Sequence, residues 1–340
     1  MTAAADRPDP RRTGPIRLAL MSALVDGDLP AAYSLTLRLL DDGTPFETIV
    51  ERVLAPIQTD LGRRWADGDI SIADEHAATA VVEDLVTMLA SGLAPVTGRS
   101  VVVVCPEGDD HTLPGRIVSL LLGLNGVSAR FLGGSLPARD LGAYLETTAP
   151  FAVALSCSVP SALVGALHSI EVAHAHGVPV VVGGRAFGAD PTRSLRVGAD
   201  AWAADAAAAF RIITGWPDAG PVLANPAVPV PAEVDLLRRD RPLVVAGAIA
   251  EVAASVPSVR EASDGLHRIE VELAALVDVA GAALMLDDPS VLGEQVAWVA
   301  RHFDAYDLSP ATLDAALGAL AEAARNQGHG VAAALLDSAR

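Results

Sequence analysis

RSVVVVCPEGDDH, residues 99–111, contains four consecutive valines followed directly by a loop rich in acidic residues and glycine. An uninterrupted run of β-branched residues predicts a strand that is buried on both faces, as in a parallel sheet. The polar residues that follow predict a loop at the carboxyl end of this strand. Ligands of open parallel sheets bind beyond such strand ends, so the loop is a candidate ligand-binding segment.

Strands alternate with helical segments through the middle of the chain, which predicts a Rossmann-like, doubly wound parallel sheet over residues 98–214. The later strand candidates are ARFLGG (129–134), AVALSCS (152–158), VPVVVGG (178–184) and AWAAD (201–205). Because parallel strands place their carboxyl ends at one edge of the sheet, we expect the loops after these strands to lie close to the loop after the valines.

Helical periodicity flanks the predicted sheet on both sides of the chain. Four apolar faces within residues 16–97, separated by short turns, predict a four-helix bundle. The first face is formed by Leu18, Leu20, Leu24 and Val25. Residues 215–232 contain five prolines and predict a semi-rigid linker. Residues 233–340 predict an all-helical domain of five or six helices, and residues 1–15 a short disordered lead.

Composition excludes several classes of function. The formal net charge of −18 argues against nucleic-acid binding, which requires a basic face. No apolar run approaches the roughly 20 residues that a membrane span needs, and the first residues lack the apolar segment of a signal peptide. We therefore expect a cytoplasmic protein that binds neither nucleic acid nor membrane. Cys105 and Cys157 fall in predicted buried strands, where a core role is the simplest interpretation.

Three polar signals occur in order at the predicted strand ends. They are Asp109-x-His111, Ser156-x-Ser158 and Gly183-Gly184. A carboxylate two residues before a histidine can bind one ring nitrogen and fix the tautomer, which leaves the other nitrogen for a metal. Taken alone, the Asp-x-His pattern is equally typical of an ordinary polar loop.

The order and spacing of these signals resemble the cobalamin-binding Rossmann-like domain. The resemblance implies that His111 is the lower ligand of cobalt and that Ser156 contacts the displaced nucleotide base beside the sheet. It also implies that the paired glycines let the backbone pass close to the nucleotide tail. The family carries a glycine three residues after the histidine, whereas this chain has Pro114 followed by Gly115, which puts the path of the loop in question.

The bundle contains Gly62-x-x-Trp65-x-x-Gly68-Asp69-Ile70 and then Glu75-His76-Ala77. This string is similar to the light-sensing subgroup of the family, which holds adenosylcobalamin in the dark. The similarity implies that Trp65 covers the upper face of the corrin, that Glu75 accepts hydrogen bonds from ribose hydroxyls, and that His76 is a second contact. The alternative is that Trp65 fills the bundle and that His76 is an ordinary polar residue.

Two departures separate the chain from the DNA-binding repressors of this subgroup. Those repressors carry a histidine after the tryptophan that captures cobalt after photolysis, whereas Ala66 stands here. His76 or water are then the candidates for the upper site. The short segment before the bundle also leads us to expect no winged-helix domain.

An all-helical domain after the sheet resembles the photocobilins, cobalamin photoreceptors with a truncated-haemoglobin-like domain that holds a bilin. This resemblance rests on architecture and implies a globin-like domain that binds biliverdin, non-covalently because both cysteines lie outside residues 233–340. The candidate contacts are Arg268, Arg301 and His302, with Trp298, Phe303 and Tyr306 as aromatic neighbours. Arginine suits the bilin propionates. An exposed face or ordinary core is the alternative for each residue.

The prediction that follows is a light sensor, not an enzyme, with adenosylcobalamin and biliverdin as pigments. We expect a homo-oligomer, with a dimer favoured. The alternative is a corrinoid carrier or a cobalamin subunit of a methyltransferase or mutase system, although the C-terminal residues are too few for a substrate barrel of roughly 200 residues or more. A Rossmann-like domain for another small molecule, or an interaction module without corrinoid, is a third interpretation.

Overall fold

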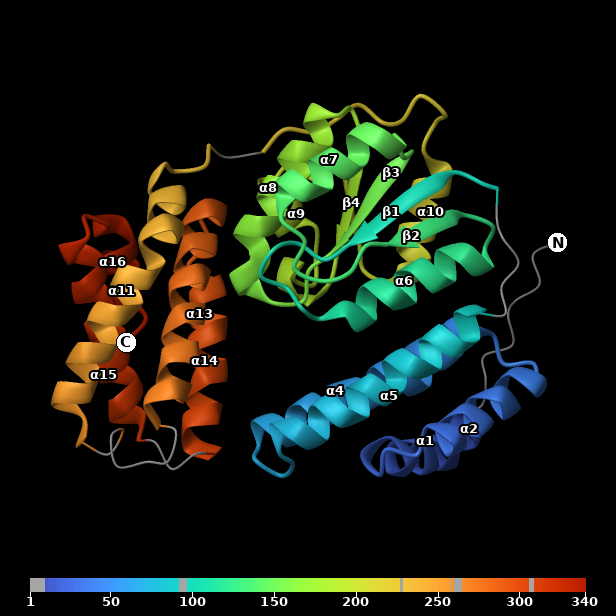
Figure 1. The fold of residues 1–340 in the computed structure, drawn as a ribbon, viewed down its shortest axis with the longest axis horizontal. Helices are drawn as coiled ribbons and strands as arrows, with labels where there is room; N and C mark the ends of the chain where they lie inside the picture. Colours follow the sequence, from blue (N-terminus) through green and yellow to red (C-terminus); the bar gives the residue numbers. More distant parts are fainter. Residues whose placement is uncertain (1–9, 92–96, 227–228, 258, 260–264, 306–308) are drawn as a thin grey trace.

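The computed structural model describes residues 10–91, 97–226, 229–257, 259, 265–305 and 309–340. For residues 10–14, 51, 302, 304 and 305 it describes the backbone alone. The described chain forms three parts, which are a helical N-terminal region, a five-stranded sheet with its helices, and a helical C-terminal region (Figure 1).

The N-terminal region is built from α1 (Pro10–Val25), α2 (Leu29–Asp41), α3 (Phe46–Ile49), α4 (Ala55–Ala66) and α5 (Ile72–Ser91). The π-helical turn Val50–Leu54 joins α3 to α4, so the third predicted helix is one helical stretch with a π turn in its middle. Pro56, which has no N–H to donate, follows this turn and is a physical reason for the wider spacing.

The expected lead and the first apolar face need correction. Helix α1 begins at Pro10, so it includes the last residues of the predicted disordered segment. Leu20 and Leu24 are fully buried, but Leu18 is 70% exposed and Val25 is 39% exposed. Positions 18 and 25 share one side of a helix, while positions 20 and 24 share another, because successive residues are about 100° apart.

The sheet contains β1 (Ser100–Val104), β2 (Ser128–Phe131), β3 (Ala152–Ser156), β4 (Val180–Gly183) and β5 (Ala201–Ala203). The strands are all parallel in the order β2-β1-β3-β4-β5, which confirms the doubly wound prediction. The four valines of β1 are buried, as their β-branched run predicts. The strand order reverses between β1 and β3, and their carboxyl ends form the crevice where such sheets bind ligands.

Helices cover both faces of this sheet. They are α6 (Thr112–Leu124), α7 (Ala138–Thr148), α8 (Leu163–Ala175), α9 (Thr192–Arg196) and α10 (Ala206–Gly215), with short 3₁₀ turns at Pro160–Ala162 (η2) and Arg185–Phe187 (η3). Helix α6 buries Leu122 against the sheet and Leu113, Leu120 and Leu121 against the bundle. It therefore lies between the sheet and the bundle and joins the two.

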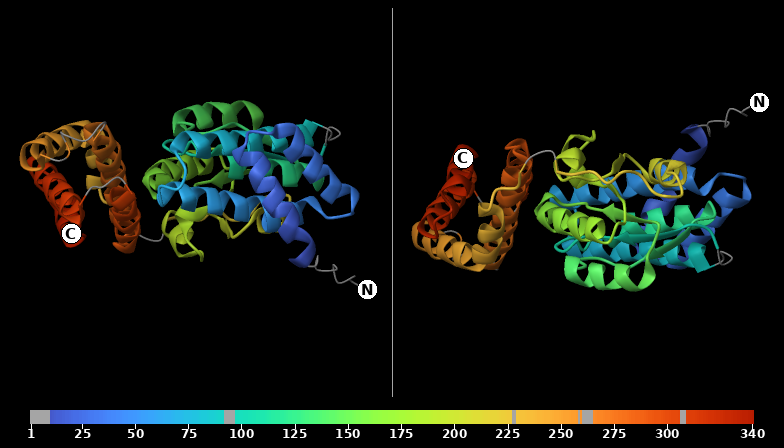
Figure 2. Two further views of the ribbon diagram at one scale, coloured as in Figure 1. Left: turned by 90° about the horizontal axis from the view of Figure 1, so that it is seen from below. Right: turned by 90° about the horizontal axis from the view of Figure 1, so that it is seen from above.

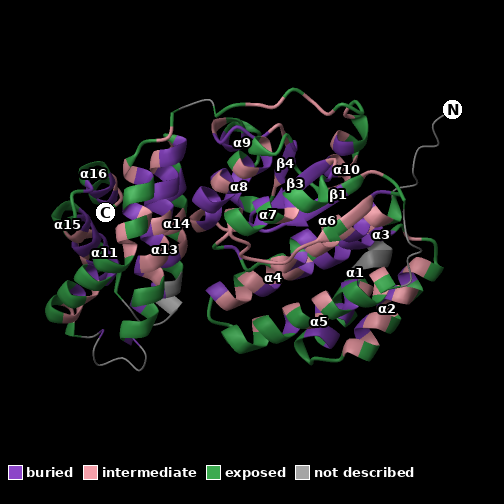
Figure 3. Cartoon of the chain, turned by 45° about the horizontal axis from the view of Figure 1, so that its top comes forward, coloured by how far each residue is buried: buried purple, intermediate pink, exposed green. Residues whose placement is uncertain are grey.

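The C-terminal region contains α11 (Glu233–Ser255), α13 (Gly265–Leu286), α14 (Ser290–Ala305), α15 (Pro310–Asn326) and α16 (Gly330–Ser338). These helices confirm an all-helical domain, while a globin arrangement stays a prediction. They group at one end of the molecule, beside the sheet (Figure 2). Buried residues of β3, β4 and α8 join those of α11 and α13 in one hydrophobic core, and β3 and β4 lie in the buried interior of the molecule (Figure 3).

Among the described helices, none combines the length and the apolar character that a bilayer span demands.

Candidate functional site

The loop between β1 and α6 fixes one histidine through a buried carboxylate. Asp109 is fully buried, and its Oδ1 lies 2.8 Å from His111 Nδ1 and accepts from the His111 backbone N–H at 3.0 Å. Its Oδ2 accepts from the backbone N–H of Ser158 at 2.5 Å. Three donors thus hold the carboxylate, which stabilises its charged form in a buried setting.

This arrangement determines which nitrogen of His111 is available. An ionised carboxylate only accepts, so the Nδ1 that faces Asp109 carries the proton. In the neutral ring the lone pair then lies on Nε2, which has no hydrogen-bond partner among the described residues. The side chain is 56% exposed. The hydrogen bond to Asp109 raises the pKa of His111, and the nearby charge of Arg185 opposes that rise. His111 is therefore an oriented imidazole ready to bind a metal.

The two serines lie beside this histidine. Ser156 ends β3 and Ser158 follows it, and both are buried. Ser156 is in register with Gly183 on the neighbouring strand β4. Because the Ser158 backbone binds Asp109, the loops after β1 and β3 are tied together. The structure thus brings all three predicted signals to one edge of the sheet, and the contact of Ser156 with a nucleotide base stays a prediction.

The paired glycines have a reason within the protein itself. Gly184 has φ +104°, and a Cβ there would collide with the carbonyl oxygen of Cys157. A Cβ on Gly183 would come within 2.9 Å of the Ala203 carbonyl oxygen. Close approach of the backbone of the neighbouring strand β5 at Gly183 and of the loop after β3 at Gly184 therefore already requires both glycines. Their contact with a nucleotide tail stays a prediction.

Gly115, which lies one position after the place where the family carries a glycine, lets a helix pack closely onto the sheet. A Cβ on Gly115 would lie 2.6 Å from Cε2 of Phe131, so α6 approaches β2 closely at this residue. Pro114 lies in the first turn of α6, where a missing N–H costs no helical hydrogen bond. Helix α6 therefore begins immediately after His111, despite the departure from the family pattern.

The other candidate residues lie at the turn between α4 and α5. Trp65 is half-buried one residue before α4 ends at Ala66, which is itself buried. Helix α5 begins with a capping box, in which the backbone N–H of Ser71 donates to Asp74 Oδ2 at 3.0 Å and Asp74 N–H donates to Ser71 Oγ at 3.2 Å. This cap fixes the start of α5 and with it the direction of Glu75.

Glu75 belongs to a polar group between α4 and α5. Thr79 Oγ1 lies 2.9 Å from Glu75 Oε1 and 3.1 Å from Gln58 Oε1. The Nε2 of Gln58 is buried and has no hydrogen-bond partner within the described part of the chain. A buried donor without an acceptor is costly, so this position suits a ligand that carries one. His76 is exposed, with its Nε2 3.7 Å from Glu75 Oε2.

The bundle meets the sheet domain next to His111. Thr112, the residue after His111, donates its hydroxyl to Glu83 of α5, and Arg116 of α6 lies 3.9 Å from the same carboxylate. The charge of Glu75 is also near enough to contribute to the raised pKa of His111. The upper-side and lower-side candidates therefore belong to one region of the molecule.

The two cysteines are core residues, as predicted. Cys105 and Cys157 are fully buried and unpaired. Burial is the main cause that raises the pKa of Cys105 to about 12, and it raises the pKa of Cys157 as well. Both therefore stay protonated at neutral pH and are poor metal ligands or nucleophiles.

The C-terminal candidates do not form a comparable group. Arg268 of α13 and Arg301 of α14 are exposed, while the side chain of His302 and all of Tyr306 lie outside the described residues. Phe303 is a core residue. The ring centroid of Trp298 lies 5.7 Å from that of Trp65 in the bundle, and a contact of Trp298 with a bilin stays a prediction.

Sequence reasoning missed several residues around this region. The contact between Gln58 and Thr79 becomes visible only when α4 and α5 are packed together. The contact of Trp298 with Trp65 becomes visible only when the C-terminal helices are packed against the bundle. A polar residue on the inner face of an amphipathic helix, as at positions 58 and 79, is the signal that could have identified the first two.

The donor set fits a metal held by a macrocycle. Within the ranges that the structure describes, no group of three or more His, Cys, Asp or Glu side chains is arranged to hold a metal ion. A single oriented imidazole suits a metal whose remaining ligands come from a tetrapyrrole. The single imidazole of His111 therefore fits the metal of a corrinoid.

Comparison with known proteins also indicates cobalamin binding. Residues 17–90 match a family model described as B12 binding domain, and residues 99–213 match a second model of the same description. The HTH-type transcriptional repressor CarH of Myxococcus xanthus is 30% identical over 139 residues, which are 40% of this chain. The match spans 46% of that repressor, so this chain covers about half the length of its curated relative.

Three solved structures are similar at low identity. They are the monomethylamine corrinoid protein of Methanosarcina barkeri (20% identity, 57% of this chain and 94% of that chain, TM-score 0.48), the methanol:cobalamin methyltransferase complex MtaBC of the same organism (20%, 64% and 88%, 0.33), and a cobalamin-binding protein of Desulfitobacterium hafniense DCB-2 (21%, 59% and 98%, 0.33). The two family matches thus place two B12 binding domains in succession along the chain, a helical one over residues 17–90 and a sheet-containing one over residues 99–213.

Proposed function

We propose that this protein is a light sensor that binds adenosylcobalamin between the bundle and the sheet, with His111 as the lower ligand of cobalt. The observation that carries the proposal is the geometry of this histidine. A fully buried carboxylate holds Nδ1, while the exposed ring offers Nε2 at the carboxyl edge of the sheet. This edge lies within the segment that matches a B12 binding domain.

On the lower side, the protein orients and tunes one ligand. Asp109 keeps the proton on Nδ1 of His111 and increases the basicity of Nε2. The backbone N–H of Ser158 keeps Asp109 in place. We assign the buried Ser156 to the displaced nucleotide base and the Gly183-Gly184 loop to its tail.

On the upper side, the bundle recognises the adenosyl group. When bound, adenosylcobalamin would supply a cobalt–carbon bond that light breaks. Trp65 covers the corrin face, Glu75 accepts hydrogen bonds from ribose hydroxyls, and the exposed His76 is a second contact. These residues keep their contacts only while the adenosyl group is present, so the bundle has different partners in the dark and in the light. Such differential contacts are what a conformational signal requires.

The similarity to the repressor CarH supports a sensor, while the lower site would equally serve a corrinoid carrier or a mutase subunit. The two functions differ in the upper ligand that the protein retains. A sensor of this type keeps adenosylcobalamin, and a methyl carrier keeps methylcobalamin. Glu75 and the buried Nε2 of Gln58, which has no partner among the described residues, favour a polar upper ligand such as the adenosyl group.

We further propose that the C-terminal helices bind biliverdin and that the protein acts as a homodimer without enzymatic activity. Support for the bilin comes from the resemblance in architecture and from the exposed arginines Arg268 and Arg301, which can pair with propionates. His302 is the third candidate contact.

Absorption spectroscopy tests both pigments. The protein is incubated in the dark with adenosylcobalamin, methylcobalamin or biliverdin, desalted, and measured before and after green and red light. We expect adenosylcobalamin to be retained and its spectrum to change in green light, and biliverdin to add a red-absorbing band. Retention of methylcobalamin alone would favour the carrier, and loss of every cobalamin on desalting would overturn the proposal. Loss of biliverdin alone would overturn its assignment to the C-terminal helices.

A further inference from the structure

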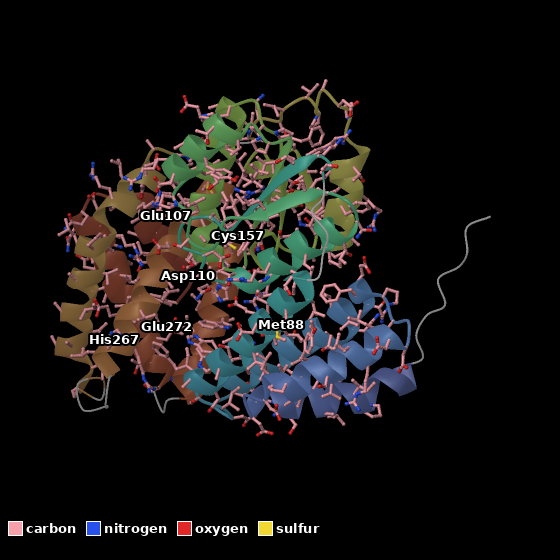
Figure 4. All side chains as sticks on the ribbon, turned by 45° about the vertical axis from the view of Figure 1, so that its right-hand side comes forward. Met88, Glu107, Asp110, Cys157, His267 and Glu272 are labelled. Carbon is pink, nitrogen blue, oxygen red and sulfur yellow. The ribbon has the colours of Figure 1, made fainter. Side chains whose placement is uncertain are left out.

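The C-terminal domain is attached firmly to the sheet domain at the edge that carries His111. Arg238 of α11 lies 2.7 Å from Oε2 of Glu107, four residues before His111 in the same loop. Arg193 lies 2.6 Å from Glu294 of α14, and α13 lies against η2 and α8. Glu107, labelled in Figure 4, thus faces the C-terminal helices. Together with the shared hydrophobic core, these contacts make the sheet and the C-terminal helices one body.

The same domain also reaches the bundle. Trp298 of α14 lies with its ring centroid 5.7 Å from that of Trp65, and the two ring planes are inclined by 55°. This is the range in which aromatic pairs attract each other. Helix α14 lies against α4 at this point. The C-terminal domain therefore contacts both the lower-ligand loop and the tryptophan that we assign to the upper face.

The position of Trp65 explains why it needs such a partner. Helix α4 ends one residue later, and Gly68 with φ +76° reverses the chain in the turn that follows. The indole of Trp298 supplies an aromatic neighbour from another domain and restricts the orientation of Trp65.

We propose that Trp298 is a positioning residue for Trp65, through which the C-terminal domain both shapes the upper-ligand site and senses whether the adenosyl group is present. The inference rests on the proposed function. Because the C-terminal helices are fixed to the sheet, Trp298 is a stationary reference against which the bundle moves. When Trp65 loses its contact with the adenosyl group, its pairing with Trp298 changes, and the bundle separates from α14.

Ligand preference tests the first half of this proposal. Dissociation constants for adenosylcobalamin and hydroxocobalamin are measured in the dark for the wild type, Trp298→Ala and Trp298→Phe. We expect Trp298→Ala to lower the preference for adenosylcobalamin about 5- to 10-fold, and Trp298→Phe to restore most of it, since a second ring still contacts Trp65. Trp216→Ala, which disrupts the pair with Phe151, is the matched control and should leave the preference unchanged.

A purely structural role of Trp298 would weaken both cobalamins equally, and that result would overturn the proposal. Adenosylcobalamin that fails to bind the wild type would instead overturn the proposed function itself. The two failures are therefore distinguishable in one set of titrations.

Distance measurements test the second half. One pair of spin labels, at Arg63→Cys on α4 and Ala297→Cys on α14, measures the distance between the bundle and the C-terminal helices. A second pair, at Glu171→Cys on α8 and Glu251→Cys on α11, measures the distance between the sheet domain and the C-terminal helices. All four positions are exposed, while the natural cysteines are fully buried. We expect light to broaden and lengthen the first distance in the wild type and to leave the second unchanged. In Trp298→Ala the first distance should be broad already in the dark. Photolysis that leaves the first distance unchanged would overturn the proposal.

Discussion

His111 and His174 each lie 2.8 Å from a buried aspartate, at opposite edges of the same sheet. Asp109 follows β1 at the carboxyl edge, whereas Asp200 lies at the amino edge, where it accepts from the backbone of Val180, the first residue of β4, at 2.6 Å. The histidine at the carboxyl edge is 56% exposed and the one at the amino edge is 16% exposed. The hydrogen bond itself therefore does not identify a metal ligand. Exposure of the ring at the carboxyl edge of the sheet is what makes His111, and not His174, the candidate ligand that we propose.

The largest expected effect is on stability. His174→Ala leaves the carboxylate of Asp200 buried without its imidazole partner, and we expect it to lower the free energy of unfolding by about 3 kcal/mol. His111→Ala also removes an imidazole partner from a buried carboxylate, but this ring is 56% exposed, so its removal admits water that can replace the lost donor to Asp109, and we expect a cost of only about 1 kcal/mol. Urea denaturation of the cobalamin-free proteins measures both. Equal losses would break the distinction between a structural and a functional pair.

Cobalamin binding should show the reverse order. We expect His111→Ala to weaken binding on the order of 100-fold, about 2.7 kcal/mol, because it removes the proposed lower ligand of cobalt. His174→Ala, which removes the same ring from the other edge, should change affinity less than about twofold. Equilibrium dialysis in the dark measures the affinity, and the visible spectrum reports the nitrogen ligand. An unchanged affinity in His111→Ala would argue for a site elsewhere.

Substitution of the two aspartates sharpens the comparison. Asp109→Asn keeps the size of the side chain but removes the charge that orients His111, so we expect about a tenfold loss of cobalamin affinity, or about 1.4 kcal/mol. Asp200→Asn is the matched control and should leave the affinity near that of the wild type. If both variants bind equally weakly, the effect on binding comes from general destabilisation.

The contrast between the two edges also explains what the sequence could predict. Parallel topology dictates that strand ends meet, so Asp109-x-His111 and the two serines could be placed together from the order of the strands alone. His174 and Asp200 were not among the residues predicted from the sequence, and only packing shows that they form a pair and that the pair is covered.

The contacts that the sequence did not predict join elements that are distant along the chain. The Trp298–Trp65 pair depends on how α14 approaches α4, and neither the periodicity nor the composition of residues 290–305 indicates a partner. Gly183 and Gly184 were expected to admit a nucleotide tail, which stays a prediction, and the atoms that already require glycine at both positions belong to Cys157 and Ala203. Local patterns thus indicate that a position is constrained, while the tertiary fold determines which neighbouring atoms constrain it.

A third carboxylate, which is only half-buried, shows how many donors such a group needs. Asp109 and Asp200 each have three, whereas the partner that we describe for Asp278 of α13 is one cation, Arg241 at 3.0 Å. Burial raises the pKa of Asp278 to about 6, although the charges of Arg241 and Arg238 oppose it. Burial also acts to raise the pKa of Asp200, but its hydrogen bonds from His174, Val180 and Ala224 prevail and lower it.

The two carboxylates should therefore affect stability in opposite directions as the pH falls. The folded state holds a proton on Asp278 more tightly than the unfolded chain does, whose value is near 3.8, so this residue stabilises the fold increasingly as the pH falls through 6. From pH 8 to pH 5 the gain is about 1.4 kcal/mol. Asp200, with its lowered pKa, contributes stability above about pH 4 and loses it below. Urea denaturation at several pH values should show that Asp278→Asn removes this gain and that Asp200→Asn retains it. A gain that survives in Asp278→Asn would assign it to other titrating groups, and the number of donors would then not explain which buried carboxylates stay charged.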